Sequence, residues 1–207
     1  EHRLKDLSAP ERIFQLGTGA FPPLRTLWRT NLPIPTTPFL GRERDLAGVG
    51  ALLADPETRV LTLTGAGGSG KTRLALQAAA AGADEFPGGV WWVALAPLAD
   101  PALVLPTAAQ TLGASGELAE HLPDERTLVL FDNFEHVLSA AGELAELVGA
   151  CPALTVLVTS REPLRLSAER EYAVPPLDRA EAIAFFEARA QAAGTALDDD
   201  ERVAEVC

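Results

Sequence analysis

The sequence lacks the features of a membrane protein and of a disulfide-stabilised secreted domain. No apolar run approaches the roughly 18 residues that a membrane-spanning helix needs, and Glu1 to Asp6 are mostly charged where a secretory signal is apolar. The chain has only two cysteines, Cys151 and Cys207, whose separation fits neither a metal site nor a disulfide framework. We therefore expect a cytoplasmic domain with reduced thiols and no contact with a membrane.

Positive charge is also scarce. The 17 Lys and Arg residues face 29 Asp and Glu residues, which gives a formal net charge of −12. Because attraction to phosphates supplies most non-specific nucleic-acid affinity, this balance predicts no direct nucleic-acid binding by this segment. What is present is 207 residues of 47% hydrophobic composition, enough for one domain with its own core and an appendage.

Proline, glycine and threonine concentrate between residues 17 and 38, a composition that predicts an extended linker. Residues 1 to 16 would then end a preceding domain, and a globular domain would occupy residues 39 to 193. Residues 194 to 207 would begin a helical domain, because Asp198 to Asp200 are typical of a helix cap. These ends predict that the chain is part of a longer polypeptide.

From residue 39 onward, short apolar runs alternate with alanine- and leucine-rich stretches of helical spacing. Strands that are apolar on consecutive residues and alternate with helices are typical of a parallel sheet covered on both faces. The sequence therefore predicts an α/β fold with an open parallel five-stranded sheet sandwiched by helices. The expected strands are 60–64, 90–96, 127–131, 155–159 and 171–174, and the expected helices are 42–54, 71–81, 101–112, 140–148 and one opened by Asp178 that ends near 193.

The strongest local motif is a glycine-rich segment between the first strand and the next helix, and it matches G-x-x-x-x-G-K-[ST]. Glycines allow successive backbone N–H groups to turn toward a phosphate chain, and the helix N-terminus adds partial positive charge. Lys71 would reach the β- and γ-phosphates and Thr72 would bind Mg²⁺. The alternative is a chance glycine-rich turn, which the flanking strand and helix disfavour. The expected binding residues here are Gly65, Ala66, Gly67, Gly68, Ser69, Gly70, Lys71, Thr72 and Arg73.

A phosphate site with Mg²⁺ also needs a carboxylate at the end of a neighbouring strand, since Mg²⁺ prefers oxygen ligands. Asp132 follows the apolar run 127–131 and is the candidate carboxylate for metal binding and catalysis. The alternative is an ordinary Asp-Asn turn that ends a strand.

Two more charged residues are candidates for catalysis. Glu135 is the nearest carboxylate that could orient the attacking water, although it also fits a solvated position, and His136 reads more readily as structural. Arg161 follows the strand 155–159 and would point into the same crevice as Lys71 and Asp132 to contact the γ-phosphate. The alternative for Arg161 is a surface ion pair with Glu162 or Glu169.

Several segments in joint order resemble the STAND class of signal-transduction ATPases, which is related to NB-ARC and AAA modules. They are Phe39-Leu40-Gly41-Arg42-Glu43, the segment 64–72, Leu130 to His136, Val158 to Leu164 and Pro175-Pro176-Leu177. The resemblance implies the strand order 5-1-4-3-2, ATP or ADP with Mg²⁺ as cofactors, and Arg161 as γ-phosphate sensor. It also implies a base pocket that includes Phe39, Gly41, Arg42 and Pro176.

Two departures from that class affect the functional prediction. Asn133 stands where many relatives have a second acid, and the helical domain that closes over the nucleotide is missing before Cys207. We expect a slow Mg²⁺-dependent ATPase switch of a signalling or transcription regulator, acting with flanking domains and in a nucleotide-dependent homo-oligomer. The alternatives are a small-molecule kinase and a non-hydrolytic ATP-binding module. A GTPase is disfavoured, because the sequence has no Asn-Lys-x-Asp element.

Residues 1 to 16 resemble the last strands of a class III nucleotide cyclase domain. The segment contains none of a cyclase's metal- or base-binding positions, so the resemblance implies a domain arrangement and no activity.

Overall fold

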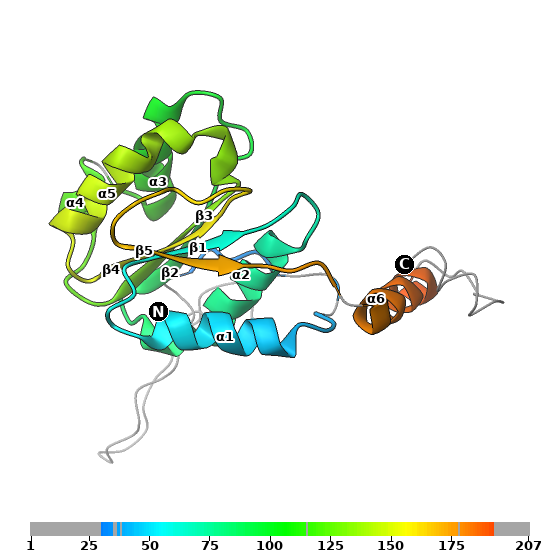
Figure 1. Cartoon of the computed structure of the whole chain (residues 1–207). Helices are drawn as coiled ribbons and strands as arrows, with labels where there is room; N and C mark the ends of the chain where they lie inside the picture. Colours follow the sequence, from blue (N-terminus) through cyan, green and yellow to red (C-terminus); the bar gives the residue numbers. More distant parts are fainter. Residues whose placement is uncertain (1–29, 35–36, 38, 115, 178, 193–207) are drawn as a thin grey trace, which may run out of the picture.

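Five parallel strands form one sheet in the order β2-β3-β4-β1-β5, which confirms the expected fold class and strand order. The computed structural model describes residues 30–34, 37, 39–114, 116–177 and 179–192 (Figure 1). The segments expected to belong to a cyclase-like domain, 1–16, and to a further helical domain, 194–207, lie outside these residues, as does Asp178. The strands are β1 (Val60–Thr64), β2 (Gly89–Ala94), β3 (Thr127–Asp132), β4 (Leu154–Thr159) and β5 (Glu169–Ala173).

Helices α1 (Glu43–Ala54) and α2 (Lys71–Ala81) cover one face of the sheet, and α3 (Val104–Leu112), α4 (Leu118–His121) and α5 (Ala141–Ala150) lie on the other (Figure 1). Helix α6 (Arg179–Ala192) lies beyond the sheet, and 3-10 turns occur at Ala83–Glu85, Pro101–Leu103, Phe134–His136 and Leu138–Ala140. Successive strand residues point to opposite faces, so Val129 and Phe131 pack under α3 and α5, whereas Leu128 and Leu130 pack under α1 and α2. Within the described ranges, no helix is both long and apolar enough to cross a membrane.

The element bounds differ from the sequence prediction where backbone geometry decides. The first helix begins at Glu43 instead of Arg42, because Arg42 has a φ of 63° and a left-handed conformation. The helix expected from Pro101 opens as a 3-10 turn, in which the side chain of Asp100 accepts a hydrogen bond from Ala102 N, and α3 starts at Val104. Helix α4 was not predicted, because its four residues are too few to show a helical spacing of apolar side chains.

The described part of the proline-rich segment contacts the free edge of the sheet. Thr30 forms a parallel bridge with Val90, and the Asn31 side chain bonds the backbone of Trp92 as donor and acceptor, at 2.8 and 2.6 Å. Leu32 packs against the core under α1 and α2. This segment therefore shields the edge strand β2 from further strand pairing.

Tyr172 of the edge strand β5 packs against helix α1. The Tyr172 hydroxyl donates to Asp45 Oδ1 at 2.7 Å. A side chain at Gly48 would place its Cβ 3.1 Å from the Tyr172 ring, so the glycine allows the ring to lie against the helix. Burial, and then the hydrogen bond to Asp45, raises the pKa of Tyr172 to about 12.

The raised pKa makes the stability of this contact depend on pH. Because the phenol loses its proton near pH 10 when unfolded and near 12 when folded, its contribution is complete below pH 10 and is lost between 10 and 12. Tyr172 is the chain's one tyrosine, so phenolate absorbance reports this group alone. We expect Tyr172→Phe to lose less stability than wild type over that interval, by urea unfolding. A phenol that titrates near 10 in the folded chain would contradict the assignment.

Candidate functional site

The glycine-rich loop between β1 and α2 adopts backbone angles that its glycines permit. Gly65, Gly68 and Gly70 have φ values of 146°, 79° and 86°. A Cβ at Gly65 would lie 2.8 Å from the carbonyl oxygen of Val174, so that position excludes any side chain. Gly70 precedes α2 in a left-handed conformation and leaves the first N–H groups of the helix facing the loop. The loop therefore offers the backbone donors and the helix end that phosphate binding uses.

Lys71 lies inside this loop and is 8% exposed. Its Nζ donates to the carbonyl oxygens of Gly65 at 2.8 Å and Ala66 at 2.9 Å. Burial lowers the pKa of the Lys71 ammonium; the charge of Glu135 raises it, that of Arg161 lowers it and that of Asp132 raises it. Glu135, Arg161 and Asp132 are therefore close enough to the Lys71 ammonium for their charges to affect its pKa.

Asp132 is held at the carboxyl end of β3 by two hydroxyl groups. Thr72 Oγ1 donates to Asp132 Oδ1 at 2.7 Å and Thr159 Oγ1 donates to the same oxygen at 2.6 Å. Thr159 also accepts a hydrogen bond from Asn133 N at 3.0 Å. Parallel strands end at one edge of the sheet, which brings these groups together from β3, β4 and α2.

These groups fit a Mg²⁺ ion accompanied by phosphate. Thr72 and Asp132 supply a hydroxyl and a carboxylate side by side, the oxygen donors that Mg²⁺ prefers. In the part of the chain that the structure describes, no three His, Cys, Asp or Glu side chains gather as a metal cluster. A cation beside Asp132 would thus complete its coordination with phosphate and water oxygens, as Mg²⁺ does in nucleotide sites.

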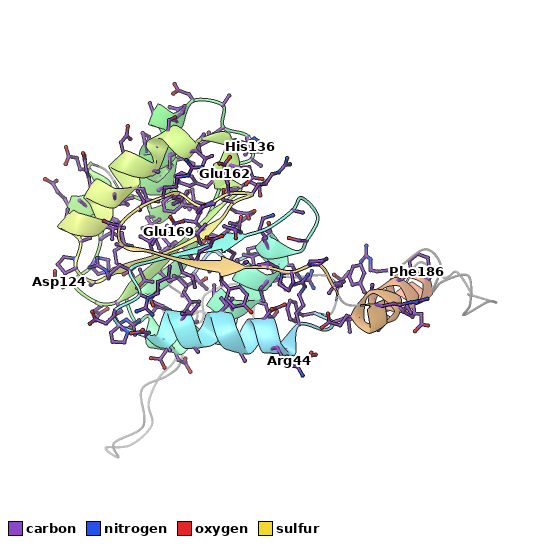
Figure 2. All side chains as sticks on the ribbon, in the orientation of Figure 1. Arg44, Asp124, His136, Glu162, Glu169 and Phe186 are labelled. Carbon is purple, nitrogen blue, oxygen red and sulfur yellow. The ribbon has the colours of Figure 1, made fainter. Side chains whose placement is uncertain are left out.

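Asn133 has a backbone role that explains its residue type. It adopts φ 66° and ψ 46°, a left-handed conformation that asparagine tolerates better than most residues. It opens the 3-10 turn Phe134–His136, which Phe134 anchors by packing edge-on against Phe131 with ring centroids 6.2 Å apart. This turn leaves His136 exposed (Figure 2). It also places Glu135 next to Arg161.

Arg161 pairs with Glu135 and not with Glu162 or Glu169, the two alternative partners considered from the sequence. Arg161 Nε lies 3.2 Å from Glu135 Oε1. The proposed alternatives are wrong because Glu162 lies near Arg165, and Glu169 accepts hydrogen bonds from Leu164 N and Leu166 N. Glu135 and Arg161, two of the residues predicted to act in catalysis, therefore form an ion pair with each other in this structure.

A cavity of about 650 Å³ adjoins the loop, and Arg161 is not among its lining residues. It combines a largely apolar wall with the polar backbone groups of the glycine-rich loop, as small-molecule sites commonly do. Phe39, Arg42 and Pro176 line it as expected, whereas Gly41 lies against the side chain of Glu181. The lining residues are Thr37, Phe39, Leu40, Arg42, Ala66, Gly67, Gly68, Ser69, Gly70, Arg73, Pro176, Leu177, Ala182, Phe185 and Arg189.

Arg42 holds the glycine-rich loop in place through hydrogen bonds to the backbone. Its Nη2 donates to the carbonyl oxygens of Ser69 at 2.7 Å and Pro175 at 2.8 Å, and its Nη1 donates to Asp45 at 2.9 Å. Its backbone N donates to Glu181 of α6 at 3.1 Å. One buried guanidinium thereby joins α1, the glycine-rich loop and the segment after β5.

Arg73 joins the segment before the domain to α2. Its Nη1 donates to Thr37 Oγ1 at 3.0 Å and its Nη2 to the carbonyl oxygen of Thr37. Its Nε is buried and has no hydrogen-bond partner among the described residues. The guanidinium thus fixes Thr37 at the wall of the cavity and leaves one donor unused. The contact with Thr37 has no sequence signal beyond its place after the motif.

Sequence relatives of the chain include much longer bacterial proteins. No protein-family model matches the chain. It is 41% identical over 150 residues to "Putative HTH-type transcriptional regulator Rv0890c" of Mycobacterium tuberculosis, which covers 68% of this chain and 17% of that protein. It is 29% identical over 174 residues to "Regulatory protein AfsR" of Streptomyces griseus, which covers 75% of this chain and 18% of that protein. The chain thus spans less than a fifth of the length of either relative.

Solved structures share the fold at low sequence identity. Cdc6p of Pyrobaculum aerophilum matches with a TM-score of 0.57 and 17% identity over 73% of this chain and 49% of that one. The Walker-type ATPase PABY2304 of Pyrococcus abyssi gives 0.59 and 14% over 81% and 62%. A STAND protein with a tetratricopeptide-repeat sensor, PH0952 of Pyrococcus horikoshii, gives 0.52 and 17% over 84% and 28%. The chain has the fold of P-loop NTPases.

The bracing role of Arg42 predicts a large effect of its removal. Arg42→Ala deletes three charged hydrogen bonds made by a buried guanidinium, so we expect the free energy of unfolding to fall by about 2–4 kcal/mol. Arg44, exposed on α1, is the matched control, and Arg44→Ala should change it by less than about 0.5 kcal/mol (Figure 2). Urea unfolding measures both values. Equal effects of the two substitutions would show that Arg42 braces nothing.

Proposed function

We propose that this chain is an ATP-binding switch module of a multidomain regulator, with Mg²⁺-dependent and slow hydrolysis. The observation that carries the proposal is the meeting of Lys71, Thr72 and Asp132 at the glycine-rich loop. An ammonium, a hydroxyl and a carboxylate in that arrangement match the needs of a metal-bound triphosphate.

Each residue has a distinct role in binding. The loop amides and Lys71 bind the β- and γ-phosphates, and Lys71 exchanges the carbonyl oxygens of Gly65 and Ala66 for phosphate oxygens. Thr72 and Asp132 hold the cation, and Phe39 and Pro176 contact the base. ATP with Mg²⁺ supplies, when bound, the terminal phosphate whose loss distinguishes the two states of a switch.

The wider protein supplies the rest of the switch. The two relatives are named as transcriptional or regulatory proteins and are several times longer, which supports a role in regulation with flanking domains. We propose that residues 39–193 are the nucleotide-binding domain, that nucleotide state alters its contacts with flanking domains or other copies, and that DNA contact, where it occurs, belongs to another segment. The net charge of −12 supports the last point.

A non-hydrolytic ATP-binding module is the second candidate. Two observations favour it: Asn133 is committed to a backbone turn, and Glu135, the nearest candidate base, is paired with Arg161. The two candidates share the binding site and differ only in turnover.

Calorimetry with Mg²⁺ and ATP tests the binding site. Since a charged hydrogen bond contributes about 1.5–3 kcal/mol, we expect Lys71→Ala to weaken ATP binding by about ten- to a hundredfold. Asp132→Asn should weaken binding only when Mg²⁺ is present, and Arg44→Ala should leave it unchanged. Phosphate release then separates a slow ATPase from a non-hydrolytic module. Absence of Mg–ATP binding by the wild-type chain, or transfer of phosphate to a small acceptor, would contradict the proposal.

Thr159 should act as a positioning residue for Asp132. Thr159→Val removes the donor to Asp132 Oδ1, so we expect ATP affinity in Mg²⁺ to fall by about three- to tenfold, with no change in affinity when EDTA removes the metal. Thr159→Ser keeps the hydroxyl and should restore the affinity. A similar loss with and without metal would assign Thr159 a purely structural role.

A further inference from the structure

We propose that Glu135 is a surrogate for the γ-phosphate: it holds Arg161 in the nucleotide-free protein, and ATP, but not ADP, must displace it. This inference rests on the proposed function, because it concerns how the same site distinguishes the two nucleotides. It assigns Glu135 a role in nucleotide specificity instead of the water-orienting role that its position after β3 suggested.

The position of Arg161 indicates where the terminal phosphate would lie. The cavity adjoins the glycine-rich loop, Phe39 and Pro176 line it, and Arg161 is not among its lining residues. The guanidinium of Arg161 lies beside Gly67 of the loop, where a Cβ would be 3.7 Å from Arg161 Nη2. A triphosphate that extends from the cavity through the loop therefore ends at Arg161. A diphosphate ends one group earlier.

Glu135 occupies the position that the terminal phosphate would take on Arg161. Its Oε1 lies 3.2 Å from Arg161 Nε, and its charge acts on Lys71 as well. Carboxylate and phosphate oxygens accept the same guanidinium hydrogen bonds, so the two groups compete for one donor set. The carboxylate thus compensates the charges of Arg161 and Lys71 while no phosphate is bound.

The pair is built so that it can exchange partners. The Arg161 side chain is 64% exposed, so it can move without unpacking the core, whereas the Glu135 side chain is 13% exposed. Glu135 Oε2 is buried and has no hydrogen-bond partner among the described residues. A carboxylate with one unsatisfied buried oxygen is a weaker partner for Arg161 than a phosphate with more charge.

Because ATP must displace Glu135, its apparent affinity is the intrinsic affinity multiplied by the fraction of molecules in which Arg161 is free. An ion pair whose arginine is largely exposed to solvent is weak, so the effect corresponds to about two- to fivefold in affinity. ADP does not reach Arg161 and does not incur this cost. The pair therefore reduces the preference for ATP over ADP until Glu135 is drawn away, which gives neighbouring domains a point of control.

A double-mutant cycle on nucleotide affinity tests the proposal. Calorimetry would measure ATP and ADP binding in Mg²⁺ for wild type, Glu135→Gln, Arg161→Gln and the double variant, with Glu162→Gln as the control carboxylate beside the site. We expect Glu135→Gln to bind ATP about two- to fivefold more tightly and ADP unchanged, and this gain to vanish in the Arg161→Gln background. Glu162→Gln should match wild type.

Other outcomes would overturn the inference and separate it from the proposed function. An unchanged ATP affinity, an equal gain for ADP, or a gain that persists without Arg161 would show that Glu135 acts by general repulsion or not at all, while ATP binding itself stands. If the wild-type chain binds neither nucleotide, the proposed function and this inference both fail. Unfolding curves for each variant verify that the fold is intact before affinities are compared.

Discussion

The candidate site depends on the hydrogen bonds that hold Asp132 Oδ1 between the hydroxyls of Thr72 and Thr159. These two bonds join the end of β3 to the start of α2 and the end of β4, and they fix the carboxylate next to the glycine-rich loop. A parallel sheet makes the arrangement possible, because all of its strands end at one edge and direct their last side chains to one place. The metal-binding role that we propose for Asp132 follows from this placement.

A second constraint is the bracing of the loop from outside the sheet. Arg42 ties the loop to α1 and to the segment after β5, and Arg73 ties α2 to Thr37 in the segment before the domain. That segment also pairs with the edge strand β2 through Thr30 and Asn31. The cavity beside the loop is thus lined by residues from both ends of the domain, Thr37 and Phe39 before α1 and Pro176 and Leu177 after β5. A nucleotide that fills the cavity would contact both the segment before α1 and the segment after β5.

Sequence reasoning recovered the fold because its signals are strong and local. Apolar strands alternating with helices gave the sheet, and the motif from Gly65 to Thr72 gave the loop, since only a few residue types allow those backbone angles. The partner of Arg161 could not be obtained in this way, because it depends on the left-handed turn at Asn133 that brings Glu135 into the crevice. Thr159 was missed for a related reason: it is the last residue of β4, and the alignment of β4 with β3 decides which carboxylate its hydroxyl contacts. Two helices start later than predicted: α1 begins after the left-handed Arg42, and α3 begins after the 3-10 turn that Pro101 opens.

The central claim is that Lys71, Thr72 and Asp132 bind the triphosphate and its metal at one loop. A crystal structure of the chain with Mg²⁺ and a non-hydrolysable ATP analogue tests it most directly. We expect Lys71 Nζ to leave the carbonyl oxygens of Gly65 and Ala66 for phosphate oxygens, the metal to lie between Thr72 and Asp132, and the base to occupy the cavity beside Phe39. An analogue bound elsewhere, or one that leaves Lys71 on the loop carbonyls, would contradict the account.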